Sequence, residues 1–99
     1  MSKTKALDPA ILRRCAGALR TLSHPARLRI VEQLECGPRS VGDLAEALGR
    51  PQATTSQHLM RLRAFGLVEV ERDGRTALYR IRHRGCLTIL NCIRTHFSK

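Results

Sequence analysis

The residues best suited to chemistry in this sequence are polar side chains gathered in one short segment, "PQATTSQHLMRLRAFG", residues 51–66. The members expected on the open face of a helix are Gln52, Thr54, Ser56, Gln57, His58 and Arg61. A glutamine side chain can form two hydrogen bonds with adenine in the major groove, one with N6 and one with N7. A threonine methyl group can contact the methyl group of thymine. The segment therefore predicts a helix that reads base edges in double-stranded DNA.

A second group of side chains suited to a polyanion follows in "ERDGRTALYRI", residues 71–81. An Asp-Gly pair between two alternating apolar and polar runs is a strong β-hairpin signal, so we expect the chain to turn at Asp73 and Gly74. Arg72 and Arg75 would then sit at the tip of the hairpin. Arginines placed there can lie along phosphates or enter the minor groove, which fixes the register of a protein on DNA.

The net charge of the chain supports the same kind of partner. The formal net charge is +10, and residues 50–99 carry ten basic side chains against three acidic ones. No acidic side chain follows Asp73. An unrelieved positive field of this kind suits a polyanion. Charge alone is also consistent with a nonspecific basic nucleoid or RNA-binding protein that has no inducer, but that alternative does not account for the polar helix face.

The apolar periodicity of the remaining chain predicts a helical scaffold for these two groups. Asp8 before Pro9 is typical of a helix start. Ser40 with Asp43 three residues later forms a capping-box pattern. The predicted helices cover residues 9–21, 25–36, 41–48, 51–65 and 86–97, with the hairpin at 67–81 between the last two.

These elements together predict a mainly α fold with a small β-hairpin, a winged helix-turn-helix of five helices plus the wing. The whole chain, residues 1–99, is expected to form a single DNA-binding domain without internal repeats. A chain of 99 residues leaves much of its surface uncovered and often gains stability by pairing. The apolar side of the helix at 86–97 therefore favours a dimer.

Several other classes of protein are disfavoured by what the sequence lacks. It has no apolar run long enough for a signal peptide or a membrane span, so we expect a cytoplasmic protein with no membrane partner. It has no glycine-rich phosphate loop and no evident acid–base pair, so we expect no enzymatic activity. It has no Cys-x-x-Cys pair, which disfavours a zinc finger.

Three motifs carry a resemblance to a known family: "LRTLSHPARLRIVEQL", "SVGDLAEALGRPQATTSQHLMRLRAFGLV" and "ERDGRTALYRI". In this order they resemble the arsenic-repressor (ArsR/SmtB) family of bacterial regulators. The resemblance implies a homodimer joined through the first and fifth helices. It also implies a pair of recognition helices that reads an inverted-repeat operator and releases it when an inducer binds. Pro51 departs from the family, which often has a serine there that caps the helix.

The two familiar metal sites of that family are not preserved. Where arsenite or cadmium sensors have Cys-Val-Cys before Asp-Leu, this chain has Ser40, Val41 and Gly42. The places that match the zinc ligands near the C-terminus hold His83, Gly85, Thr95 and Ser98. One possible ligand of four is too few, and His83 and His96 are interpreted as surface histidines.

The four cysteines are the remaining sensor candidates, and in a reducing cytosol they are expected to be free thiols. Cys86 and Cys92, six residues apart, cannot bind one ion within an intact helix, because about 9 Å of helical rise separates them. The resemblance brings Cys15 on the first helix close to the fifth, so Cys15, Cys86 and Cys92 would form a cross-subunit set. That set could bind arsenite or another thiophilic ion, or respond to an oxidant or a persulfide. Alternatively, Cys15 and Cys86 only pack as small apolar residues, and Cys36 is a bystander or a lone redox-reactive thiol.

Overall fold

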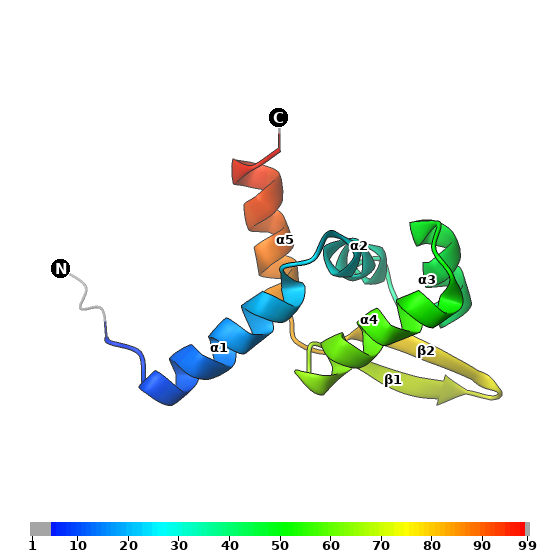
Figure 1. The fold of residues 1–99 in the computed structure, drawn as a ribbon, viewed down its shortest axis with the longest axis horizontal. Helices are drawn as coiled ribbons and strands as arrows, with labels where there is room; N and C mark the ends of the chain where they lie inside the picture. The colour runs from blue at the N-terminus through cyan, green and yellow to red at the C-terminus, as the bar shows by residue number, and fades with distance from the viewer. Residues whose placement is uncertain (1–4, 99) are drawn as a thin grey trace.

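The computed structural model describes residues 5–98 and contains five helices and one hairpin within them. The elements in chain order are α1 (Pro9–Leu22), α2 (Pro25–Leu34), α3 (Val41–Leu48), α4 (Gln52–Ala64), β1 (Val68–Asp73), β2 (Thr76–Ile81) and α5 (Gly85–His96). Helices α2, α3 and α4 gather with the hairpin into one body, from which α1 and α5 project at the same end (Figure 1). The predicted winged helix-turn-helix with five helices and a wing is confirmed.

Helices α1, α2 and α3 begin where local side chains satisfy free backbone N–H groups of their first turns. The Asp8 carboxylate accepts a hydrogen bond from the Ala10 N–H at 2.8 Å, which starts α1. The Ser40 hydroxyl accepts from the Asp43 N–H at 3.1 Å, which starts α3. Helix α3 ends at Gly49, whose φ of 65° lies in the left-handed region that favours glycine.

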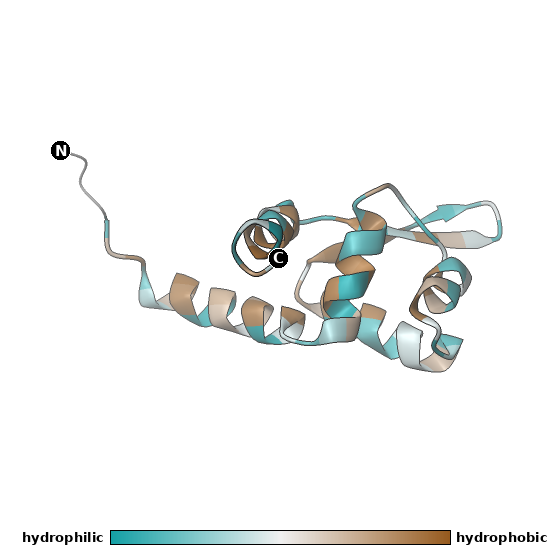
Figure 2. Ribbon diagram, turned by 90° about the horizontal axis from the view of Figure 1, so that it is seen from above, coloured by the Kyte–Doolittle hydropathy of each residue, from teal (hydrophilic) through white to brown (hydrophobic). Residues whose placement is uncertain are grey.

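A single hydrophobic core fixes how α2, α3 and α4 pack together. Ile30, Leu44, Leu59 and Leu62 are completely buried, and Val68 of β1 is 1% exposed. Because these side chains come from four different elements, their burial sets the angle between α3 and α4, the two helices that flank the short turn. Hydrophobic residues also continue along α1 and α5, away from this core (Figure 2).

The hairpin has the predicted alternation, with Val68 opposite Ile81 and Val70 opposite Tyr79. The predicted position of its turn was wrong by one residue. Asp73 forms the last pair of the ladder with Thr76, so the connecting residues are Gly74 and Arg75. Gly74 has a φ of 66°, and a glycine with positive φ at the first central position matches the type II′ turn that suits the twist of a hairpin.

A backbone connection that the sequence did not predict holds the wing against the helices. Arg39, in the segment between α2 and α3, donates its N–H to the Tyr79 carbonyl at 3.0 Å. The Tyr79 N–H donates in return to the Arg39 carbonyl at 2.8 Å. This bridge makes β2 a fixed neighbour of the turn before α3 and so sets the position of the wing relative to α4.

Helix α5 packs on α2 by one side and leaves its end uncovered. Cys86 and Leu90 are buried, whereas Phe97 at the C-cap is 78% exposed. The Arg94 guanidinium forms two hydrogen bonds with the Glu35 carboxylate at the end of α2, at 2.7 and 3.0 Å. This pairing lowers the pKa of Glu35.

Candidate nucleic-acid interface

Helix α4 presents several polar side chains to the surface, with Met60 also exposed among them. Gln52, Gln57 and Arg61 are exposed, and Thr54 and Ser56 are half-buried. Five of the six side chains predicted to read bases are therefore accessible from one side of the domain. The α4 face is suited to the major groove, which admits one helix.

The N-terminus of α4 is capped differently from the other helices near it. Pro51 occupies the N-cap position and makes no side-chain hydrogen bond to the first turn. The Thr55 hydroxyl, which is fully buried, donates instead to the Pro51 carbonyl at 3.0 Å. The helix forms without the serine cap, as the departure at Pro51 implied.

His58 was predicted on the open face of α4, and the structure shows that this placement is wrong. Its side chain is 9% exposed, and its Nδ1 atom accepts a hydrogen bond from Nε of Arg27 at 3.1 Å. The His58 and His24 rings lie 4.6 Å apart between their centroids. Burial lowers the pKa of His58, and the nearby positive charges of Arg27 and Arg50 add to this shift, as does His24. His58 therefore joins α4 to the start of α2.

The tip of the wing carries two arginines, with Asp73 beside them in the sequence. Within residues 5–98, Arg72 and Arg75 are exposed and form no ion pair. Nearer the base of the hairpin, Arg80 lies 2.7 Å from the Glu69 carboxylate and 3.2 Å from that of Glu71. These hydrogen bonds and charges raise the pKa of Arg80. Within the hairpin, the arginines without an ion pair are therefore the two at the tip.

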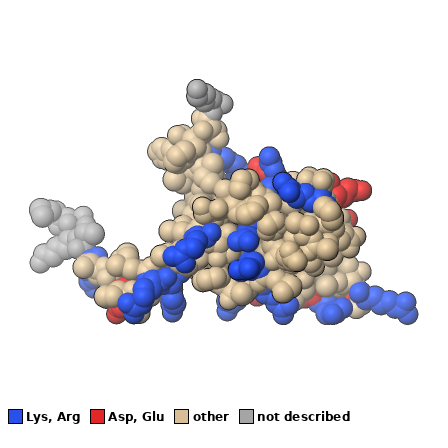
Figure 3. All heavy atoms as spheres, in the orientation of Figure 1, with Lys and Arg blue, Asp and Glu red and all other residues tan. Residues whose placement is uncertain are grey.

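The surface on the side of α4 has the same sign of charge. In Figure 3, Lys and Arg side chains are spread over α1, α4 and the tip of the wing, and acidic side chains appear only toward the edges of this view. A helix with exposed hydrogen-bonding side chains, flanked by positive charge, can contact base edges and phosphates together.

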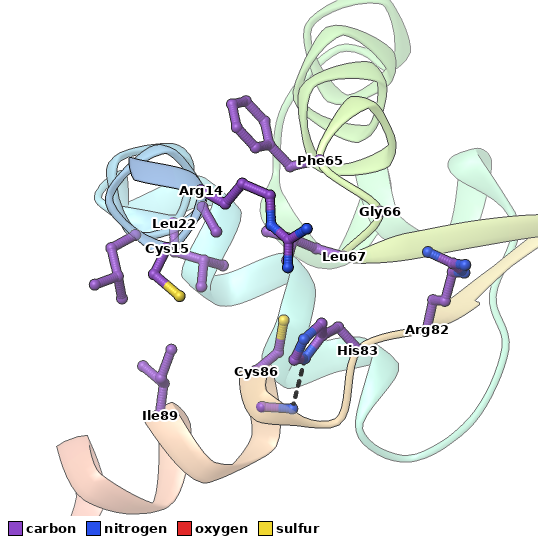
Figure 4. Close-up of a pocket in the computed structure, with 13 residues that line it drawn as sticks. Arg14, Cys15, Leu22, Phe65, Gly66, Leu67, Arg82, His83, Cys86 and Ile89 are labelled. Atoms are coloured by element: carbon purple, nitrogen blue, oxygen red, sulfur yellow. Dashed lines mark hydrogen bonds between the residues drawn. The ribbon is translucent and has the colours of Figure 1, made fainter. Parts of the chain in front are cut away.

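Two of the three predicted sensor thiols meet in one pocket. The pocket has a volume of about 470 Å³ and lies between α1, the end of α4, the start of β1 and α5. Cys15 and Cys86 both line it, and both sulfur atoms are directed into the space between α1 and α5 (Figure 4). Cys86 is 2% exposed, and burial raises the pKa of its thiol.

The other two cysteines lie outside this pocket, on exposed positions. Arg14, Arg82 and His83 line the pocket together with the thiols, which the sequence did not indicate because these residues come from separate elements. His83 is exposed, and its Nδ1 accepts from the Gly85 N–H at 3.1 Å. Among residues 5–98, no three His, Cys, Asp or Glu side chains are close enough to form a metal site.

The fold and the polar face of α4 define the class of protein: a winged helix-turn-helix domain of the kind found in DNA-binding transcriptional regulators. Residues 24–70 match the model of the family described as bacterial regulatory protein, arsR family. The biofilm growth-associated repressor of Xylella fastidiosa is 40% identical over 82 residues, which cover 83% of this chain and 72% of that repressor. The chain belongs to the ArsR family of bacterial regulatory proteins.

Two further relatives extend the comparison. The transcriptional regulator NmtR of Mycobacterium tuberculosis is 44% identical over 73 residues, which cover 74% of this chain and 61% of NmtR. This chain therefore spans less than two thirds of the length of NmtR. The homodimeric winged helix-turn-helix DNA-binding domain of a possible ArsR-family regulator from Mycobacterium bovis superposes with a TM-score of 0.80. That match has 29% identity and covers 96% of this chain and 88% of that one.

The family and these relatives are transcriptional regulators and not enzymes, as the sequence predicted. In the part of the chain that the structure describes, no helix is long and apolar enough to cross a membrane.

Proposed function

We propose that this chain is a homodimeric, sequence-specific transcriptional repressor that binds an inverted-repeat DNA operator and releases it when an inducer binds. The observation that carries the proposal is the exposed polar face of α4 beside a wing whose tip arginines have no acidic partner within residues 5–98. A nonspecific basic protein has no use for glutamine, threonine and serine side chains placed together on one accessible helix.

The roles of the DNA-binding residues follow from their exposure. The residues proposed to contact base edges are Gln52, Thr54, Ser56, Gln57 and Arg61. Arg72 and Arg75 are proposed to contact phosphates, which positions the recognition helix without reading sequence. His58 is proposed to act from within the protein, because its ring is buried against α2.

Dimerisation is supported by apolar surface on α1. Ile11, Leu12 and Leu19 are 40%, 51% and 53% exposed, and Phe97 at the end of α5 is exposed as well. Both helices project from the same end of the domain (Figure 1), so a second copy could cover both at once. In the homodimer, two α4 helices would contact half-sites about one helical turn of DNA apart.

The inducer site is proposed at the thiols, and the ligand is arsenite or another thiophilic ion, an oxidant or a persulfide. The support is that Cys15 and Cys86 line the same pocket between α1 and α5, the helices proposed to form the dimer interface. Cys92 lies outside the pocket of its own chain, so it would reach a shared site only across the interface. A coupling of about 1–3 kcal/mol between inducer and operator would weaken DNA binding about 5- to 150-fold.

The DNA-binding part of the proposal is tested by footprinting on an inverted repeat selected from random duplexes, with a shuffled duplex of the same composition as control. We expect protection of two half-sites in the selected repeat only. Gln57→Ala should reduce the preference for the selected repeat over the shuffled duplex. Equal protection of both duplexes by the wild type would favour the nonspecific alternative.

The inducer part is tested by measuring operator affinity with and without arsenite or a persulfide donor. Cys15→Ser and Cys86→Ser should each abolish the weakening of DNA binding, and Cys92→Ser should do so if the site is shared between subunits. Cys36→Ser is the matched control, because Cys36 is exposed and lies outside the pocket. Because the thiolate is the reactive form and burial raises the pKa of Cys86, the response should grow as pH rises. An unchanged response in all these variants would mean that the thiols only pack.

A further inference from the structure

A groove beside α4 contains an arginine that no part of the proposed interface yet uses. The groove has a volume of about 520 Å³ and is lined by Arg27, Gln57, His58, Met60, Arg61 and Ala64. It runs between the start of α2 and the C-terminal half of α4. It shares Gln57 and Arg61 with the proposed base-reading face. No acidic side chain lines it.

Arg27 is held in a fixed orientation by two neutral acceptors. Its Nε donates to Nδ1 of His58 at 3.1 Å, and its Nη1 donates to the Thr21 carbonyl at 3.1 Å. The Thr21 hydroxyl is itself bonded to the Gly17 carbonyl at 2.9 Å, so this end of α1 is ordered by its own hydrogen bonds. Arg27 thus has a defined position although it is only half-buried.

These two hydrogen bonds do not neutralise the positive charge of Arg27, and they leave N–H groups of its guanidinium without an acceptor. Neither a neutral imidazole nor a carbonyl offsets the positive charge, and within residues 5–98 no carboxylate lies within 4.0 Å of Arg27 or Arg61. In the same described part, no acceptor is bonded to Nη2 of Arg27. An arginine has five N–H donors, so the outer edge of this guanidinium remains free to bind an anion.

We propose that Arg27 binds a phosphate of the DNA backbone in this groove, beside the base-reading face to which Arg61 belongs. The inference rests on the proposed DNA binding and adds a contact from α2, outside the recognition helix and the wing. A phosphate is the fitting occupant because it is anionic and because it would lie next to base edges contacted by Gln57. The fixed guanidinium would set the depth at which α4 enters the major groove of the DNA. His58 is the residue that positions this guanidinium.

The experiment measures the affinity of the dimer for a fluorescent duplex that carries the selected repeat, over a range of KCl concentrations. Arg27→Gln removes one proposed phosphate contact per protomer. The slope of the logarithm of the association constant against the logarithm of salt concentration should therefore become less negative by about 1.8 for the dimer. Between about 50 and 200 mM salt, the ratio of wild-type to variant affinity should therefore decrease by roughly tenfold. Arg27→Lys keeps the charge and should retain most of the slope.

Arg29→Gln is the matched control, because Arg29 lies two residues along α2 and its guanidinium already pairs with Glu32. It removes the same charge, and its slope should change much less. Equal slope changes for Arg27→Gln and Arg29→Gln would mean that the loss of any positive charge on α2 has the same effect. That result would overturn the proposal. An unchanged slope for Arg27→Gln, with or without lower stability, would overturn it as well.

A second measurement uses the wild type and does not depend on how a variant folds. In ¹H–¹⁵N spectra, the Nε–H signal of Arg27 should shift on addition of the duplex, and that of Arg29 should not. The absence of a shift at Arg27, while backbone signals of α4 do shift, would leave DNA binding intact and refute this contact. If the wild type shows no binding to any duplex, the proposed function itself fails.

Discussion

Removal of the two arginines at the tip of the wing tests the electrostatic part of the interface. The double variant Arg72→Gln/Arg75→Gln removes charges that have no acidic partner within residues 5–98. The proposed homodimer has two wings, so the double variant loses four phosphate contacts. The slope of the logarithm of the association constant against the logarithm of salt concentration should therefore become less negative by about 3.6. Between about 50 and 200 mM salt, the affinity ratio of wild type to variant should therefore shrink by roughly 150-fold.

The assay is fluorescence anisotropy with both the selected repeat and the shuffled duplex. Because phosphate contacts carry no sequence information, the variant should lose affinity for the two duplexes alike. The single variants Arg75→Gln and Arg29→Gln form a matched pair, since Arg29 already pairs with Glu32. The reasoning is refuted if these two single variants change the slope equally, or if the double variant loses mainly the preference for the repeat.

Two further predictions concern how α4 is held. Wild-type thermal stability should decrease as pH falls below the ordinary His58 pKa of 6.5, because its lowered pKa means that the folded state binds fewer protons than the unfolded state. His58→Gln should remove this component of the pH profile, and an identical decline in that variant would assign it to another group. Leu59→Ala should lower the free energy of unfolding by about 2–5 kcal/mol in urea titrations, since the side chain is fully buried. Met60→Ala, at a neighbouring position that is 67% exposed, should change it by less than about 0.5 kcal/mol, and equal losses would contradict this packing.

The elements of the fold were predictable because their signals are local. Asp8 and Ser40 cap helices through bonds to N–H groups two and three residues away. The alternation of Val68 and Val70 predicted a strand with one face toward the core, and the ladder has that alternation. The turn was placed one residue early because the glycine of an Asp-Gly pair fits two turn types. It can occupy the second central position of a type I′ turn or the first central position of a type II′ turn. The register in the structure is the one that pairs Asp73 with Thr76.

The site was predictable only as far as one helix can reveal its own exposed face. Periodicity placed Gln57 and Arg61 on the open side of α4, and both are exposed. It also placed His58 there, at the margin of the face, where a neighbouring element decides whether a side chain is covered. Helix α2 covers that margin, so His58 is buried.

The sequence by itself determined which segments are helical, where the chain turns, and that the second half carries most of the positive charge. These properties depend on neighbours within a few residues. The tertiary structure decided that Arg27 bonds a histidine 31 residues away, that Arg39 joins Tyr79, and that Cys15 and Cys86 line one pocket. Such contacts depend on the angles at which buried side chains of different elements pack, and no local pattern specifies those angles.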